Sequence, residues 1–336
     1  MSDEPTTASP LVMALTKAAG VGGHAPSMHN TQPWRWRAQP DRLELRAVRD
    51  RQLSVGDPDG RMLTISCGAA LHHARVALAA LGWSFQVRRL PDLTDPDLLA
   101  VIGDLKQGEP DEAAIVLRAA IEVRHTDRRP VAEQRVPPSA VEAVRRAVGD
   151  EGALLQILNA DQTLDLAAEA SRAAQIQEQD RDAHDELTRW AGGGAVAGTG
   201  IDPSMLPDRA AQTTVPLRDF GAGGTLPSEG GHDRWAGYGI LYGPGDEPLD
   251  WLRAGEGLSA GWLTAETEGL SLLPMSWVAE VPGTRESLRR LIAEAGMPYL
   301  ALRLGVGRPP AVDPEAGPAP VRRIPAEQLI EVVAGP

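Results

Sequence analysis

Two stretches of this chain resemble each other at one constant spacing, and this repetition restricts the possible folds more than any other feature. Four identities share an offset of 187 residues, since 255 minus 68 and 269 minus 82 both give 187: Gly68 with Gly255, Leu71 with Leu258, Gly82 with Gly269, and Ser84 with Ser271. Each copy has small and apolar residues at helical spacing, ends at a glycine and leads into an extended segment. We therefore expect two copies of one α+β unit.

The length of 336 residues agrees with this duplication, because one domain usually has about 150 residues. We expect a first half over residues 1–115 and a second half over 116–336. The apolar fraction of 42% and the charged fraction of 24% are those of an ordinary globular protein, and no apolar run is long enough to span a membrane.

The hydrophobic periodicity predicts alternating helices and strands along both halves. Helices are expected over 11–20, 61–82, 111–124, 139–148, 161–191, 247–269, 284–296 and 324–333. Strands are expected around Trp34 and Trp36 and over 42–48, 83–90, 152–159, 234–244 and 298–307, with 270–276 as a loop or strand. Between 192 and 232 the sequence turns to glycine, proline, serine and threonine, which is typical of a lid or a linker.

The charge and the missing motifs exclude several classes of function. A net charge of −13 disfavours binding to nucleic acid. The acidic start differs from a secretory signal, which predicts a cytoplasmic protein, and the single Cys67 can form no internal disulfide. The sequence has no phosphate-binding P-loop, dinucleotide fingerprint, serine-nucleophile elbow or zinc-protease motif. Its histidines lack the spacing of metal ligands, so we expect no metal site.

One loop, HAPSMHNTQPWRW over residues 24–36, concentrates polar side chains between two prolines. Pro26 and Pro33 stiffen a segment that carries Ser27, Asn30 and Gln32 at the entry to a strand. Amide and hydroxyl groups held in this way can bind the edge of a heterocycle. The alternative is that the loop is a structural turn.

Arginines gather in two places of this acidic chain. Arg124, Arg128 and Arg129 lie within VRHTDRRP, and Arg322 and Arg323 lie within APVRRIP. Such clusters either hold one small anion or are solvated loop charges beside prolines.

Both segments resemble motifs of the FMN-dependent nitroreductases. HAPSMHNTQPWRW is similar to the A-P-S-x-x-N-x-Q-P-W segment of that family, and VRHTDRRP is similar to its R-x-[ST]-x-[RK] motif. The stretch from Asp57 to Gly82 further resembles the Acg-like branch, whose single chains contain two nitroreductase-like halves. The resemblance implies an α+β, nitroreductase-like fold with two pseudo-symmetric halves, like a fused dimer.

The order of the motifs departs from that of ordinary nitroreductases, in which the arginine motif comes first. Here each half carries only one of the two motifs, so the resemblance implies one composite FMN site per chain. Arg124 and Arg128 would bind the FMN phosphate with Thr126 beside them, and Arg322 and Arg323 would close that site. Asn30 would meet the pyrimidine edge of the flavin with Ser27 nearby, and Pro274 would lie along the ring.

The resemblance implies an FMN-dependent oxidoreductase in which the flavin carries the chemistry, with no catalytic side chain, NAD(P)H as a possible donor and a small organic acceptor as substrate. Two alternatives stay open. One is a protein that binds or sequesters FMN under a lid formed by 192–232, with little NAD(P)H-dependent turnover. The other is a biosynthetic dehydrogenase that uses oxygen as acceptor. We expect either a monomer with an internal pseudo-dimer or a homodimer.

Overall fold

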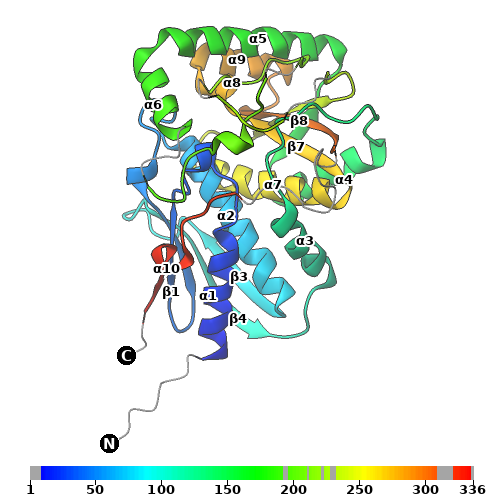
Figure 1. Ribbon diagram of the computed structural model, residues 1–336. Helices are drawn as coiled ribbons and strands as arrows, with labels where there is room; N and C mark the ends of the chain where they lie inside the picture. The colour runs from blue at the N-terminus through cyan, green and yellow to red at the C-terminus, as the bar shows by residue number, and fades with distance from the viewer. Residues whose placement is uncertain are drawn as a thin grey trace, which may run out of the picture.

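The computed structural model describes residues 9–191, 196–209, 212–220, 223–227, 232–308 and 321–333 of the chain. The described part of the protein has two halves, each with helices packed on one sheet (Figure 1). The halves meet along two long central helices, α2 and α7.

The first half contains most of the chain up to residue 123. Its elements are α1 (Pro10–Gly22), η1 (Met28–Asn30), β1 (Trp34–Ala38), β2 (Leu43–Ala47), η2 (Arg49–Arg51), α2 (Arg61–Ala80), β3 (Trp83–Arg89), β4 (Leu98–Gln107) and α3 (Glu112–Val123). Its sheet has the order β3-β4-β2-β1-β9, and β9 (Ile330–Val332) comes from the far end of the sequence.

The second half follows. Its elements are α4 (Pro138–Asp150), β5 (Leu154–Ile157), α5 (Ala160–Gln179), α6 (Arg181–Ala191), η3 (Pro203–Met205), β6 (Gly237–Gly243), α7 (Pro248–Thr267), β7 (Leu270–Met275), α8 (Trp277–Glu280), α9 (Pro282–Leu291) and β8 (Met297–Val306). Its sheet has the order β5-β6-β8-β7. The two sheets have equivalent strand orders. Starting from the strand after the long helix, the order is β3-β4-β2-β1 in the first half and β7-β8-β6-β5 in the second.

The two central helices confirm the repeat seen in the sequence. Adding 187 to the first and last residues of α2 gives the first and last residues of α7. The helices cross where Gly68 faces Gly255, and a methyl group on either glycine would overlap a backbone carbonyl oxygen of the opposite helix. One turn further on, His72 Nδ1 and Ser259 Oγ are hydrogen-bonded at 2.9 Å across the same offset. Residues that correspond in the two copies therefore touch, as they would at a two-fold axis.

The core of each half extends through these helices into the other half. Leu252 and Leu263 of α7 pack in the first core, and Met62 and Ile65 of α2 pack in the second. Sharing of this kind makes the interface between the halves as apolar as a domain interior, as in obligate dimers.

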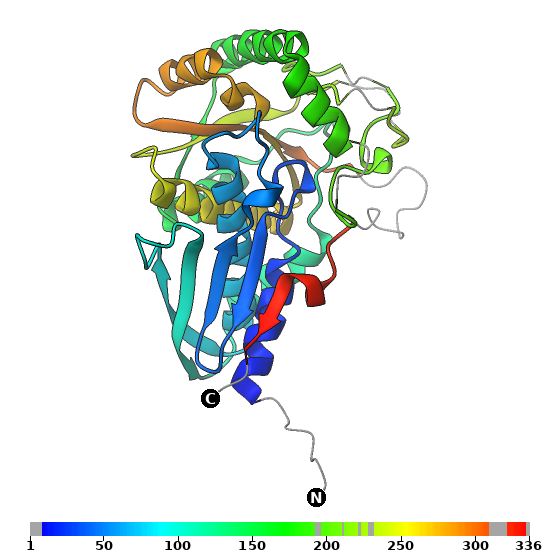
Figure 2. The same cartoon turned by 90° about the vertical axis from the view of Figure 1, so that its left-hand side faces the viewer.

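The last segment of the chain differs from the helix expected over 324–333. Only α10 (Ala326–Leu329) is helical, and β9 then pairs parallel with β1, where Trp36 lies opposite Ile330 (Figure 2). The open edge of β1 provides backbone partners for the segment, which a short isolated helix would lack. The continuous helix expected over 161–191 is also interrupted, because Asp180 has an extended backbone and begins α6.

The glycine-rich insert expected at 192–232 is described in part, and its residues 192–195, 210–211, 221–222 and 228–231 lie outside the described residues. The described parts contain η3 and two isolated bridges, Pro207 to Leu226 and Gln212 to His232. No helix in the described ranges has the length and apolar character needed to cross a bilayer.

Candidate functional site

The loop that follows α1 has an unusual backbone. His29, Asn30 and Gln32 have φ angles of 48°, 57° and 49°, in the left-handed region that most side chains avoid. The hydroxyl of Ser27 accepts the backbone N–H of Gln32 at 2.9 Å, and Ser66 of α2 accepts that of Met28 at 3.3 Å. These bonds hold a strained conformation, which is a common feature of binding sites.

The side chain of Asn30 joins three parts of the chain that are far apart in sequence. Its Nδ2 donates to the carbonyl oxygens of Gly198, Gly200 and Arg322 at 3.3, 3.1 and 3.0 Å, and its Oδ1 accepts from Arg323 at 2.6 Å. Two N–H groups are thus shared among three acceptors. Asn30 therefore fastens the insert and the C-terminal segment to the loop.

Gln32 also joins the loop to the insert and to the C-terminal segment, from a more buried position. Its Nε2 donates to the carbonyl oxygen of Gly198 at 2.8 Å, and its Oε1 accepts the backbone N–H of Ile324 at 3.0 Å. Because Gln32 is buried, these bonds also satisfy backbone groups that water cannot reach.

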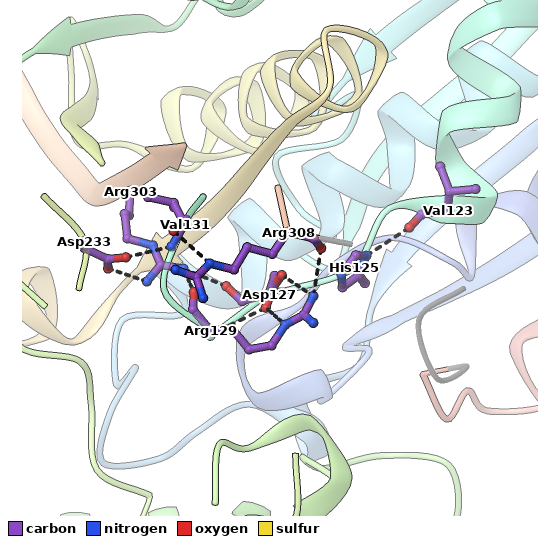
Figure 3. Close-up of polar contacts among 8 residues, drawn as sticks. All are labelled: Val123, His125, Asp127, Arg129, Val131, Asp233, Arg303 and Arg308. Carbon is purple, nitrogen blue, oxygen red and sulfur yellow. Dashed lines mark hydrogen bonds and ion pairs between the residues drawn. The ribbon is translucent and has the colours of Figure 1, made fainter. Parts of the chain in front are cut away.

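The arginine segment after α3 is held by a buried ion pair (Figure 3). Arg303 of β8 donates to Asp233 at 2.7 Å and to the carbonyl oxygens of Asp127 and Arg129 at 2.8 and 2.9 Å. Asp233 in turn accepts the backbone N–H of Val131 at 2.8 Å. Both charged side chains are almost fully buried, so this network fixes the backbone of 127–131 firmly.

Arg124 leaves the end of α3 and lies in the protein interior. Its guanidinium stacks over the ring of Trp262 at 4.5 Å, while Nε and Nη1 have no hydrogen-bond partner among the described residues. Burial lowers the pKa of Arg124 to about 10, and the nearby Glu266 opposes this shift. Burial removes the hydrogen bonds that these N–H groups would make with water, and a bound anion would replace them.

Two further arginines share this environment. Arg128 donates to the carbonyl oxygen of Met205 at 3.2 Å and lies 5.3 Å from the ring of Phe220, and burial lowers its pKa to about 10. Arg323 has its pKa lowered to about 9 by burial and by repulsion from Arg124. Because these cations repel each other, the site favours a ligand with more than one negative charge.

The arginines surround a pocket of about 550 Å³, which includes space open to solvent. It is lined by Pro26, Ser27, His29, Asn30, Arg124, Thr126, Arg128, Gly200, Ile201, Asp202, Met205, Val321, Arg322 and Arg323. Asp202 is the one carboxylate in this set, and it pairs with the exposed Arg322 at 2.6 Å. The pocket therefore carries a clear excess of positive charge.

Seven of the eight residues singled out in the sequence line this pocket: Ser27, Asn30, Arg124, Thr126, Arg128, Arg322 and Arg323. Pro274 lies in β7, paired with Leu302, and is not among the described residues of the pocket. Trp262 is one of several tryptophans that could line an aromatic pocket, but its type alone predicts a core residue as readily. The Asp233–Arg303 pair carried no sequence signal for a site, because scattered charges are ordinary features.

The equivalent position on the other side of the α2–α7 crossing is filled by an ion network. Arg75 of α2 corresponds to Trp262 of α7 at the offset of 187 residues. Arg75 forms an ion pair with Glu256 at 2.6 Å. Arg89 also pairs with Glu256 at 2.6 Å, and Glu256 is fully buried. In the first half, residues 23–33 connect α1 to β1. The equivalent connection in the second half, from α4 to β5, consists only of residues 151–153. The second half thus has no counterpart of the polar loop.

No cluster of three His, Cys, Asp or Glu side chains suited to a metal ion occurs among the residues that the structure describes. His72 is bonded to Ser259, and His73 is buried beside Arg124 with its pKa well below the ordinary value because of burial and that charge.

The fold and the pocket define a two-half α+β protein with an arginine-rich pocket lined by residues of both halves. No protein-family model matches the sequence. Relatives from Mycobacterium tuberculosis match the sequence. “Putative NAD(P)H nitroreductase Rv3131” is 39% identical over 84% of this chain and 81% of its own length. “Putative NAD(P)H nitroreductase acg” is 33% identical over 95% of this chain and 96% of its own length. The chain therefore belongs to the nitroreductase superfamily, in its Acg-like branch.

Solved nitroreductase structures are more distant in sequence. FMN-dependent nitroreductase NfnB from Mycobacterium smegmatis, in complex with NADPH, is 13% identical, covers 65% of this chain and 97% of its own, and has a TM-score of 0.39. A nitroreductase with bound FMN from Bacteroides fragilis gives a TM-score of 0.37 at 13% identity, over 59% of this chain and 91% of its own. The family membership rests on the sequence relatives.

Proposed function

We propose that this chain is an FMN-dependent oxidoreductase of the nitroreductase type, with one flavin site in the pocket between Asn30 and Arg124. The observation that carries the proposal is Arg124, a buried guanidinium whose Nε and Nη1 have no partner among the residues that the structure describes, in a pocket rich in positive charge. The phosphate of FMN is a dianion that would supply the missing acceptors. The names of the relatives, which are putative NAD(P)H nitroreductases, support NAD(P)H as the electron donor.

The residues present divide into two groups for such a cofactor. Arg124, Arg128 and Arg323 would hold the phosphate, with Thr126 beside them, and the ion pair of Arg303 would keep their segment in place. Ser27 and Asn30 form the opposite wall, on the side expected to meet the ring. In the present arrangement the N–H groups of Asn30 are taken up by Gly198, Gly200 and Arg322, so donation from this amide to a ring requires exchange of at least one of these bonds.

FMN, when bound, would supply two-electron transfer by accepting a hydride from a reduced donor and passing it to an organic acceptor. The protein would contribute orientation and charge. The arginines would balance the charge of the phosphate, and residues 198–200 of the insert would help to keep water away from the ring.

A second function is favoured by one observation, the attachment of residues 198–200 to Asn30 and Gln32. If the insert stays closed over the flavin, the protein would bind FMN with little turnover. Steady-state oxidation of NAD(P)H with an added quinone or nitroaromatic separates the two functions, since only the oxidoreductase turns over many times per flavin.

The test of the cofactor is the visible spectrum of the purified protein, followed by chromatography of the released chromophore. We expect the absorption of an oxidised flavin and release of FMN. A colourless protein that does not take up added FMN would refute the proposal and leave the pocket as a site for another anion.

A further inference from the structure

A second cavity adjoins the first, and His29 lines both. It has about 820 Å³ of space, part of it open to solvent. Its walls come from both halves: η1 and the loop 53–58 on one side, and α5, α6 and the junction of α8 with α9 on the other (Figure 1). The cavity exists only because the halves are packed together.

Most of the wall is apolar, contributed by Met28, Leu53, Ile176, Leu187 and Val281. Burial of an apolar ring against such a surface is favourable in free energy, and it requires no protein hydrogen bond to be broken.

The buried carboxylates in the wall already have partners. Glu186 accepts the hydroxyl of Ser54 at 3.1 Å and the backbone N–H of Gly56 at 2.8 Å. Glu280 accepts from Arg218 at 2.9 Å and from Gln177 at 2.8 Å. Neither therefore requires a hydrogen-bond donor from a ligand.

The charge of the wall is negative. Asp180, Glu186 and Glu280 outnumber the single cation Arg218. The imidazole of His29 stays neutral, because burial, Arg218 and Arg128 hold its pKa well below the ordinary value. An anionic ligand would meet repulsion here, in contrast to the arginine-rich first pocket.

We propose that this second cavity binds the organic electron acceptor, and that it selects an uncharged aromatic ring of the quinone class over an anionic analogue. The inference rests on the proposed function, which places the flavin in the adjoining pocket. His29 lines both cavities, and its ring is edge-on to Phe220 at 5.9 Å. An imidazole N–H there can donate to a carbonyl oxygen of the acceptor.

The first test compares two ligands on the oxidised, FMN-loaded protein with no electron donor present. Binding of 2-methyl-1,4-naphthoquinone and of 1,4-naphthoquinone-2-sulfonate is measured by equilibrium dialysis. We expect the neutral quinone to bind at least about tenfold more tightly, since one unfavourable charge contact is of that size. Equal affinities, or tighter binding of the sulfonate, would overturn the inference. Cys67 is buried, so the quinone cannot add to it readily.

The second test fills the cavity. Ala183 lines it from α6, whereas the next residue, His184, is exposed. Ala183→Trp is expected to weaken binding of the neutral quinone about tenfold or more, and His184→Trp to leave it unchanged. Unchanged binding in Ala183→Trp would contradict the proposed cavity. If that variant does not fold, the comparison of the two ligands decides alone.

FMN content, measured in every sample, separates this inference from the proposed function. A protein without flavin refutes the proposed function itself. A flavin-loaded protein that binds and reduces the quinone, unaffected by Ala183→Trp, refutes only the acceptor cavity.

Discussion

At the scale of single residues, Arg124 carries the functional assignment, because two of its buried nitrogens have no hydrogen-bond partner in the described part of the chain. Its position could be predicted from the motif VRHTDRRP, as could those of Asn30 and Arg128, because their spacing is local. Its stacking on Trp262 could not be predicted, since that contact depends on how the two halves pack. The role of Pro274 beside the flavin stays a prediction.

We expect Arg124→Ala to weaken FMN binding about ten- to a hundredfold, the loss typical of a hydrogen bond to a charged group. Flavin fluorescence during titration of the apoprotein measures this. Arg118→Ala is the matched control, because Arg118 lies on the outer side of α3 and pairs with Glu122 at 2.9 Å. The phosphate assignment fails if both variants bind FMN like the wild type.

Glu266 provides a prediction of pH dependence. Burial raises its pKa to about 7, against the opposing effect of Arg124, so the folded state holds the proton more tightly than the unfolded state. Its stabilising effect is therefore complete below about pH 4.5 and is lost as the pH rises through 7, by up to about 3 kcal/mol. Glu266→Gln should lose less stability than the wild type between pH 5 and 8.

Urea unfolding at pH 5, 6, 7 and 8 measures this difference. Glu268→Gln, at an exposed position of the same helix end, should follow the wild type. Parallel curves for Glu266→Gln and the wild type would show that the carboxyl group does not titrate in this range.

At the scale of elements, the repeat at offset 187 predicted α2 and α7 well, because a long helix with a glycine at its crossing point leaves a clear pattern. The strand β9 was missed. Residues 330–332 form a strand only because the edge of β1 is available to them, and a local pattern cannot indicate such a distant partner.

Gly255→Ala tests the crossing. The added methyl group would overlap the carbonyl oxygen of Ile65, so we expect a loss of at least about 3 kcal/mol in the free energy of unfolding. Gly20→Ala is the control, because Gly20 lies in α1 with open space around it and should gain about 0.5–1 kcal/mol. Similar urea midpoints for the two variants would contradict the close approach of the helices.

At the scale of the whole molecule, the two halves are alike in topology and unlike in function. The polar loop 23–33 has only the three residues 151–153 as its counterpart, and the buried Glu256 pairs with Arg75 and Arg89 where the second site would lie. The sequence predicted one composite site, because each half carries one motif. The boundary near residue 115 stays a prediction, and so does the oligomeric state.

We therefore expect one FMN per chain at saturation. The ratio of flavin to protein absorbance after unfolding in denaturant gives this number directly. A ratio of two would mean that the ion network opens to admit a second cofactor, against the free-energy cost of separating buried charges.

The strand β9 also has a consequence for synthesis of the protein. The first sheet is completed by residues 330–332, and the pocket by Arg322 and Arg323, all near the end of the chain. Domains usually fold in the order in which the ribosome produces them. Here the first sheet and the pocket stay incomplete until residues 322–332 have been synthesised, so a chain terminated before residue 322 would lack both β9 and the two arginines.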